Sequence, residues 1–176
     1  FENVEGCTKM SSDRQYLEKP EGHHCFACGT ANPIGLNMQF YPCGDKLCSD
    51  VVFKSEHVGW ENLAHGGIIS AVLDEIMSWA VLYFRRAFFV TRKMEVKYVH
   101  PVPVGMLMTA RGRVVDVSDR KKLALKGELL DQGGRLFAKA KGEFVELALD
   151  RLTGVPQSAK DEMLRLFSLY RERTLD

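Results

Sequence analysis

One long helical segment that is apolar on most of its sides restricts the fold more than any other feature. Residues 65–86 carry bulky apolar side chains at helical spacing along one face. Trp79, Leu82 and Tyr83 widen that face beyond what a surface helix carries. A helix of this kind must be covered by other elements, so the sequence predicts that it is buried at the centre of the domain.

Strand-like segments stand before and after this helix in the sequence. Alternating polar and apolar residues, bounded by turn-forming residues, predict strands at residues 35–41, 47–53, 88–99, 106–117, 123–131 and 136–147. Turn signals at residues 42–45 and at Gly133 and Gly134 separate some of them. This order predicts an α+β fold in which an antiparallel sheet of five or six strands wraps around the single central helix.

The chain of 176 residues has the length of one domain with its own core. We expect that domain to occupy residues 23–150. Residues 1–22 are polar and weakly patterned, and they are predicted to form an N-terminal arm. Residues 151–176 are predicted to form a helical tail, because apolar residues recur at helical spacing after Pro156.

Charge and hydropathy exclude two classes of partner. The chain has 24 basic and 23 acidic residues and a net charge of +1, so bulk charge does not hold it to nucleic acid. Its longest apolar stretch, residues 76–84, is broken by Ser78 and falls far short of the roughly 20 residues that cross a bilayer. No charged-then-apolar leader is present in these residues, and we expect no membrane partner. The cysteine content favours a cytoplasmic location.

Five cysteines lie in the first 48 residues, an odd number that favours a reducing compartment over a disulfide scaffold. Four of them form two pairs, Cys25 with Cys28 and Cys43 with Cys48. The pairs could together hold zinc, with one of the two histidines before Cys25 as a substitute ligand. The second pair has poor ligand spacing, however, and the first pair can equally be small buried residues in a turn. We therefore expect no bound zinc.

The start of the helix carries the most informative chemistry. Gly66 and Gly67 follow His65, and their backbone N–H groups have no partner within the helix. Such N–H groups carry partial positive charge and could stabilise a carbonyl oxygen that develops negative charge. Asp74 lies on the small-residue face of the same helix, where it could act as a nucleophile or as a general base for water.

The residues alone leave other interpretations open. The glycines can form no more than a tight turn into the helix, and Asp74 can be a solvated or capping carboxylate. Glu75 is a rival carboxylate that projects about 100° away around the helix. We favour Asp74 because it lies between Ser70 and Ser78, on the face that a substrate or a second subunit could approach.

Two motifs around this helix resemble those of a known family. The first is the sequence HGG at residues 65–67, followed by Asp74 nine residues after the histidine. The second is the segment 90–101, in which Thr91 precedes an alternating strand that ends in a tyrosine and a proline.

The lead-in before the first strand completes the resemblance. It consists of CFACG at residues 25–29 and NPIGL at residues 32–36. With all three motifs in order, residues 23–148 resemble the hotdog-fold acyl-CoA thioesterases of the phenylacetic-acid-degradation type. These enzymes belong to the 4-hydroxybenzoyl-CoA thioesterase superfamily.

The resemblance implies roles for particular residues. Asp74 matches the family's catalytic acid, and Gly66 matches the glycine whose N–H polarises the thioester carbonyl. Thr91 matches a hydroxyl residue that helps to place the attacking water, and His65 matches a histidine that orients the site. Many members also have an asparagine six places before that histidine, where this chain has Gly59.

That departure leaves two interpretations of the second oxyanion donor. In the first, Asn62, three places before the histidine, supplies the second oxyanion donor through a different loop path. In the second, the chain lacks that donor. Among the substrate-binding candidates, Gly67 offers a further N–H group. Arg92 and Lys93, and the basic turn that contains Arg120, could hold the phosphates of coenzyme A, although charged turns are often simply solvated.

The resemblance implies hydrolysis of an acyl-CoA thioester to the free acid and coenzyme A, with no cofactor. It also implies a homodimer or homotetramer, since a monomer would leave sheet edges unpaired. A hotdog dehydratase or hydratase is a second hypothesis, which the absence of proline from residues 57–65 disfavours. A non-catalytic acyl-CoA-binding hotdog domain is a third, which the glycine at position 59 keeps open.

Overall fold

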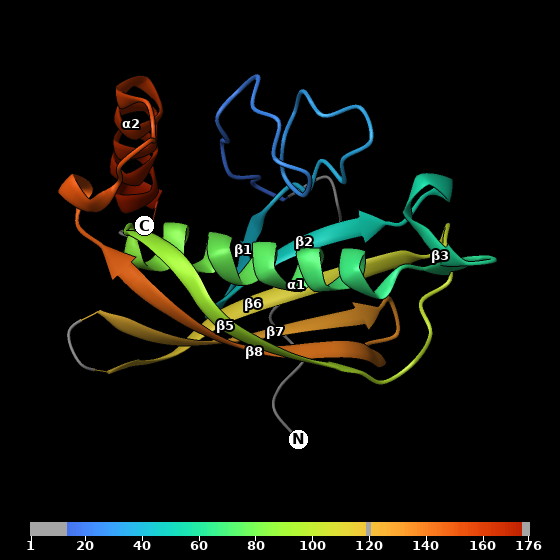
Figure 1. Ribbon diagram of the computed structural model, residues 1–176. Helices are drawn as coiled ribbons and strands as arrows, with labels where there is room; N and C mark the ends of the chain where they lie inside the picture. Colours follow the sequence, from blue (N-terminus) through green and yellow to red (C-terminus); the bar gives the residue numbers. More distant parts are fainter. Residues whose placement is uncertain (1–13, 119–120, 174–176) are drawn as a thin grey trace.

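The computed structural model describes residues 14–118 and 121–173, and it confirms the predicted α+β architecture. The helix α1 (Gly66–Ala80) lies along the concave side of a six-stranded antiparallel sheet (Figure 1). The segment before the first strand passes over the other side of α1, so the helix is covered from both directions (Figure 1). This arrangement is the hotdog fold that the resemblance implies.

Six strands form the sheet, and their order in space differs from their order in the sequence. They are β1 (Tyr41–Cys43), β2 (Lys46–Val52), β5 (Phe88–Tyr98), β6 (Leu107–Ser118), β7 (Lys122–Asp131) and β8 (Leu136–Leu147). Across the sheet the order is β1-β2-β6-β7-β8-β5, and each neighbouring pair is antiparallel. The four long strands predicted after the helix are confirmed, and β5 stands at an edge of the sheet.

The predicted central helix is confirmed, and it ends in an unusual turn. α1 continues into a π-helical turn, η3 (Val81–Arg85), in which the N–H of Arg86 donates to the carbonyl oxygen of Val81 at 3.1 Å. Arg86 then adopts a left-handed conformation, with φ at 52°, which ends the helix. By length and composition the 20 residues Gly66–Arg85 could cross a bilayer, but here they form the helix that the sheet encloses.

Glycines in the middle of the sheet let α1 approach it closely. Gly112 in β6 pairs with Gly127 in β7, and both lie beneath the helix. A Cβ atom on Gly112 would lie 2.5 Å from the carbonyl oxygen of Ile76, too close for any real contact. A side chain at this position would push the helix off the sheet. The apolar side chains of α1 are fully buried around this contact, among them Val72, Leu73, Ile76 and Met77.

The predicted strand at residues 35–41 is wrong in most of its length. Only Tyr41–Cys43 pairs with β2, and residues 36–40 lie outside the sheet. The N–H groups of Leu36 and Met38 donate instead to the carbonyl oxygens of Phe26 and Ala27 in the lead-in, both at 2.9 Å. The alternating pattern there reflects packing of this segment against the core rather than a place in the sheet.

A small hairpin that the sequence did not predict leads into α1. It follows the short helix η2 (Ser55–His57) and consists of β3 (Val58–Trp60) and β4 (Leu63–Ala64). The N–H of His65 donates to the carbonyl oxygen of His57 at 2.9 Å, which fixes the chain just before the helix.

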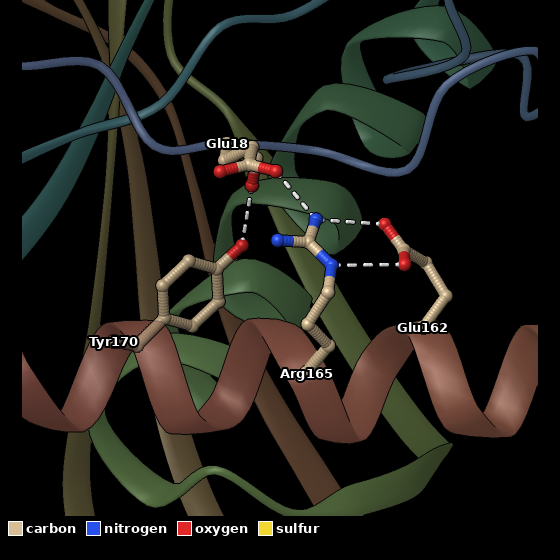
Figure 2. A network of polar contacts seen from close by, with 4 residues as sticks. All are labelled: Glu18, Glu162, Arg165 and Tyr170. Atoms are coloured by element: carbon tan, nitrogen blue, oxygen red, sulfur yellow. Dashed lines mark hydrogen bonds and ion pairs between the residues drawn. The ribbon is translucent and has the colours of Figure 1, made fainter.

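Within the predicted tail, the structure has the helix α2 (Gln157–Arg173), which packs over the C-terminal end of α1 (Figure 1). The ring of Tyr170 lies 5.8 Å from that of Tyr83, centroid to centroid. Figure 2 shows how α2 also contacts the N-terminal segment: Arg165 forms ion pairs with Glu18 and Glu162, and the Tyr170 hydroxyl donates to the backbone oxygen of Glu18. The tail therefore shares the core of the domain.

Candidate functional site

The first turn of α1 is capped by the side chain of its own preceding residue. The Nδ1 atom of His65 accepts a hydrogen bond from the N–H of Gly67 at 2.9 Å. Because Nδ1 accepts, the ring proton of a neutral His65 lies on Nε2. This contact corrects the expectation that both glycine N–H groups are available, since that of Gly67 is already used. The N–H of Gly66, in the first turn, has no acceptor within the helix.

A tyrosine at the end of β5 holds this turn from the other side. The Tyr98 hydroxyl lies 2.6 Å from the Ser70 oxygen and 2.9 Å from the carbonyl oxygen of Gly66. Ser70 also donates to that carbonyl oxygen, at 3.1 Å. A Cβ atom on Gly66 would just touch the Tyr98 ring, at 3.4 Å. Sequence reasoning named Tyr98 only as part of a strand pattern, and the structure places it against the candidate oxyanion donor.

A pocket of about 470 Å³ opens beside Gly66. It lies between the hairpin β3–β4, the start of α1 and the end of β5. Its lining is largely apolar and includes Trp60, Leu63, Ile69, Tyr98 and Val102. An apolar pocket with a backbone donor at its wall can accept the carbonyl end of an acyl chain.

The structure also shows what stands at the two candidate positions for a second oxyanion donor. Asn62 is exposed in the turn of the β3–β4 hairpin, and it does not line the pocket that contains Gly66. At Gly59 a Cβ atom would lie 2.8 Å from the Cα atom of His65. The asparagine that many hotdog thioesterases carry there would not fit unless His65 moved. Neither position therefore places a side-chain donor beside Gly66.

Asp74 lies in the middle of α1 and points toward the edge strand. Its Oδ1 atom accepts a hydrogen bond from the hydroxyl of Thr91 on β5, at 3.0 Å. Partial burial raises the pKa of Asp74, and the hydrogen bond from Thr91 opposes that rise. The structure thus brings Asp74 and Thr91 of the same chain together.

A β-bulge puts Thr91 on the inner face of the sheet. In the register of β5 with β8, Thr91 pairs with Phe144 and Lys93 pairs with Glu143, so Arg92 is the extra residue. Phe144 is fully buried, and residues opposite one another in a pair share a face. Without the bulge, alternation would place Thr91 on the outer face with Lys93. The hydrogen bond to Asp74 depends on this one extra residue.

Glu75 points away from Asp74 and contacts the lead-in segment. Its Oε1 atom accepts a hydrogen bond from the indole N–H of Trp79 at 2.9 Å. Its two carboxylate oxygens lie 3.9 and 3.8 Å from the sulfur of Cys25. Burial raises the pKa of Glu75 to about 7. The two adjacent acids of α1 therefore belong to two different environments.

The lead-in turn brings two cysteines to Glu75. The ligand atoms of Cys25, Cys28 and Glu75 all lie within 4.8 Å of one another, whereas Cys43 and Cys48 are not part of this group. The Cys28 side chain and the backbone of Cys28 and Ala27 favour the thiolate form of Cys25. These contacts lower the pKa of Cys25 to about 5.

The basic candidates for binding coenzyme A lie apart from this cluster. Arg92 and Lys93 are exposed on the edge strand β5, at and beside the bulge. Arg85, the last residue of η3, forms an ion pair with Glu146 at 3.0 Å. Arg120 lies outside the described residues.

Comparisons with known proteins agree with this fold. Residues 61–138 match the model of the Thioesterase superfamily. An uncharacterised protein of Schizosaccharomyces pombe is 35% identical over 117 residues, which are 64% of this chain and 60% of that protein. This chain thus spans less than two thirds of the length of that curated relative.

Solved structures show the same architecture. A thioesterase superfamily protein, RHA08564, superimposes with a TM-score of 0.64 at 21% identity, over 69% of this chain and 60% of that one. A hypothetical thioesterase of Streptococcus pneumoniae, solved with coenzyme A, superimposes with a TM-score of 0.53 at 17% identity, over 59% and 82% of the two chains. At these identities the likeness establishes the hotdog fold.

Proposed function

We propose that the chain hydrolyses an acyl-CoA thioester to the free acid and coenzyme A, because residues 61–138 match the model of the Thioesterase superfamily and the chain has the hotdog fold. The observation that carries this proposal is the pair of Asp74 and Thr91, a half-buried carboxylate held at 3.0 Å by a hydroxyl. This pair sits on the same helix as the backbone donor Gly66. The coenzyme A in the Streptococcus pneumoniae structure supports the substrate class.

The spacing of these groups favours a site made by two chains. Gly66 and Asp74 are eight residues apart on one helix, a separation of about 12 Å along its axis. A reacting carbonyl must lie about 3 Å from both the attacking group and the oxyanion donor. One chain therefore supplies Gly66 and a second supplies Asp74. The edge strand β5, which carries Thr91 and Tyr98, is the surface through which two sheets would join.

In this dimer the thioester carbonyl oxygen accepts a hydrogen bond from the N–H of Gly66, and negative charge develops there during attack. Asp74 either removes a proton from a water that attacks the carbonyl carbon, or attacks the carbon itself and forms an anhydride that water then opens. In both routes the C–S bond breaks and the coenzyme A thiolate leaves and takes up a proton. Thr91 donates to Asp74, and its oxygen can accept a hydrogen bond from the water.

The proposal is tested by assaying release of free coenzyme A from a panel of acyl-CoA thioesters. Replacement of Asp74 by Asn should lower kcat/KM by about 10²–10⁴, the usual contribution of a positioned acid or base. Asp161→Asn is the matched control, because Asp161 is exposed on α2, far from the pocket, and its variant should keep wild-type activity. Equal rates for wild type and Asp74→Asn would contradict the carboxylate mechanism.

One observation favours a second function, binding of acyl-CoA without hydrolysis. Neither Gly59 nor Asn62 places a side-chain donor beside Gly66, so the oxyanion would have one backbone donor from that region. A missing donor raises the barrier by about 2.7–4 kcal/mol. Calorimetric binding of acyl-CoA by a wild type that hydrolyses no member of the panel would establish this alternative.

A further inference from the structure

Three metal-ligating side chains that the proposed hydrolysis does not use come together between the lead-in and α1. Cys25 and Cys28 lie in the lead-in turn, and Glu75 lies in the middle of the helix. Their ligand atoms all lie within 4.8 Å of one another, and they come from segments about 50 residues apart. Such a convergence is more specific than a Cys-x-x-Cys pair alone.

The distances fit a tetrahedral zinc ion. Zinc binds sulfur at about 2.3 Å and carboxylate oxygen at about 2.1 Å, so two ligand atoms at the tetrahedral angle lie about 3.6–3.8 Å apart. The Cys25 sulfur lies 3.8 and 3.9 Å from the two oxygens of Glu75. These two distances already match the tetrahedral separation, and the Cys28 sulfur lies within 4.8 Å of both partners.

A tight backbone turn holds the two cysteines of the lead-in close together. The N–H of Gly29 donates to the carbonyl oxygen of Cys25 at 2.9 Å and closes the turn. A Cβ atom on Gly29 would lie 2.4 Å from that oxygen, so only glycine fits after the second cysteine.

The charges of the cluster would be compensated by a divalent cation. Two thiolates and one carboxylate would carry three negative charges in a partly buried place. The nearby Lys19 ammonium donates to the carbonyl oxygens of Cys28 and Met38, at 2.9 and 2.7 Å, so backbone groups hold it in place. Trp79 donates to Oε1 of Glu75, which orients the carboxylate as the partner of a metal ligand does.

A histidine beside the turn can complete the coordination. The Nε2 atom of His23 is buried, and it has no hydrogen-bond partner among residues 14–118 and 121–173. His23 stands two residues before Cys25, but neither of its ring nitrogens belongs to the group of ligand atoms that lie within 4.8 Å of one another, so its ring would have to turn toward the cluster to bind a shared ion. An unpartnered buried imidazole nitrogen has a desolvation cost that a metal ion would remove.

We propose that Cys25, Cys28 and Glu75 bind a zinc ion, with His23 as the fourth ligand. This proposal reverses the expectation from the sequence that no zinc is bound, because Glu75 rather than the pair of Cys43 and Cys48 meets the first two cysteines. The ion would fasten the lead-in to α1 one residue from Asp74. The proposal does not depend on the proposed hydrolysis.

Metal analysis of the full chain tests the site. Protein loaded with zinc and then dialysed should hold about one zinc per chain, and Cys25→Ala should hold less than about a tenth of that. Cys48→Ala is the matched control, because buried Cys48 in β2 is outside the cluster, and this variant should keep the full zinc content. Wild type with less than a tenth of a zinc per chain, or Cys25→Ala with full zinc, would overturn the proposal.

Two further measurements keep the test decisive even if Cys25→Ala fails to fold. Wild-type protein with cobalt in place of zinc should show thiolate-to-cobalt charge-transfer absorption, and its absence would overturn the proposal. A Cys25–Cys28 disulfide in protein isolated under reducing conditions would overturn it as well. His23→Ala should weaken zinc binding at least about tenfold, and unchanged affinity would remove His23 from the ligand set.

Discussion

The N-terminal turn of α1 and the middle of the same helix hold their functional groups in different ways. At the N-terminus the cap is local: His65 holds Gly67, and Gly66 lies between them. In the middle, Asp74 depends on a strand residue 17 positions away, and Glu75 contacts a cysteine 50 positions away. The N–H donor at the N-terminus of the helix therefore depends on the local backbone, whereas the orientation and surroundings of each carboxylate depend on tertiary packing.

This difference predicts that the two regions respond to different substitutions. A backbone donor can be removed only by changing the backbone, and a packed carboxylate can be altered through the residue that contacts it. Substitutions at Gly66 and at Thr91 therefore separate the two contributions.

Of the substitutions that separate the two regions, the largest effect is expected from Gly66→Pro, which deletes the N–H while keeping the helix. Proline is well tolerated at the first helical position. The preceding residue, His65, has φ −64° and ψ 132°, a conformation that a following proline favours. Loss of one oxyanion donor should lower kcat by about 10²–10³. Circular dichroism and thermal unfolding should remain near those of the wild type.

Gly66→Ala is the matched control for this substitution. It keeps the N–H and adds only a Cβ atom, which would meet the Tyr98 ring at an ordinary contact distance of 3.4 Å. We expect its kcat to stay within about threefold of the wild type, since alanine is also the better helix former. If both variants lose activity equally, crowding against Tyr98 rather than the missing N–H would be the cause.

A smaller but more specific effect joins the two regions across the proposed dimer. Each active site would take Gly66 from one chain and Asp74 from the other. When Gly66→Pro and Asp74→Asn chains assemble at random, half of the dimers are mixed and each mixed dimer contains one intact site. Activity should therefore return to about a quarter of the wild-type level.

The mixed-dimer experiment needs differently tagged chains that are unfolded and refolded together. Each variant refolded alone should stay inactive and serves as the control. If the mixture is as inactive as the separate variants, Gly66 and Asp74 would have to act within one chain.

The local part of the site could be predicted from the sequence, and so could most of the sheet. The periodicity of α1 and of β5 to β8 is set by burial on one face, which the residue pattern records directly. The HGG motif predicts where the helix begins, because a capping residue and its helix are neighbours in the chain. The strand predicted at residues 35–41 was wrong because the residue pattern records burial alone. The alternation there reflects burial and not pairing with a strand.

The long-range part of the site could be predicted only through family resemblance. Nothing in the residues around Thr91 signals that Arg92 is a bulge, because a bulge is defined by the register with β8. The meeting of Glu75 with Cys25 depends on the path of the lead-in over α1, which no local pattern encodes. The collision that excludes a side chain at Gly59 likewise needs the position of His65 in space.

The smallest effect is expected from Thr91→Val, which tests the middle of the helix. Valine keeps the shape and strand preference of threonine, but it removes the hydroxyl that donates to Asp74 at 3.0 Å. A hydrogen bond to a charged group contributes about 1.5–3 kcal/mol, but water can replace part of it, so kcat should fall about tenfold. KM should change little, because Thr91 holds the carboxylate rather than the substrate.

Thr91→Ser restores the hydroxyl and should recover most of the rate. Full activity in the valine variant together with a loss in the serine variant would show that the methyl group matters instead, and Asp74 would then be positioned by packing alone.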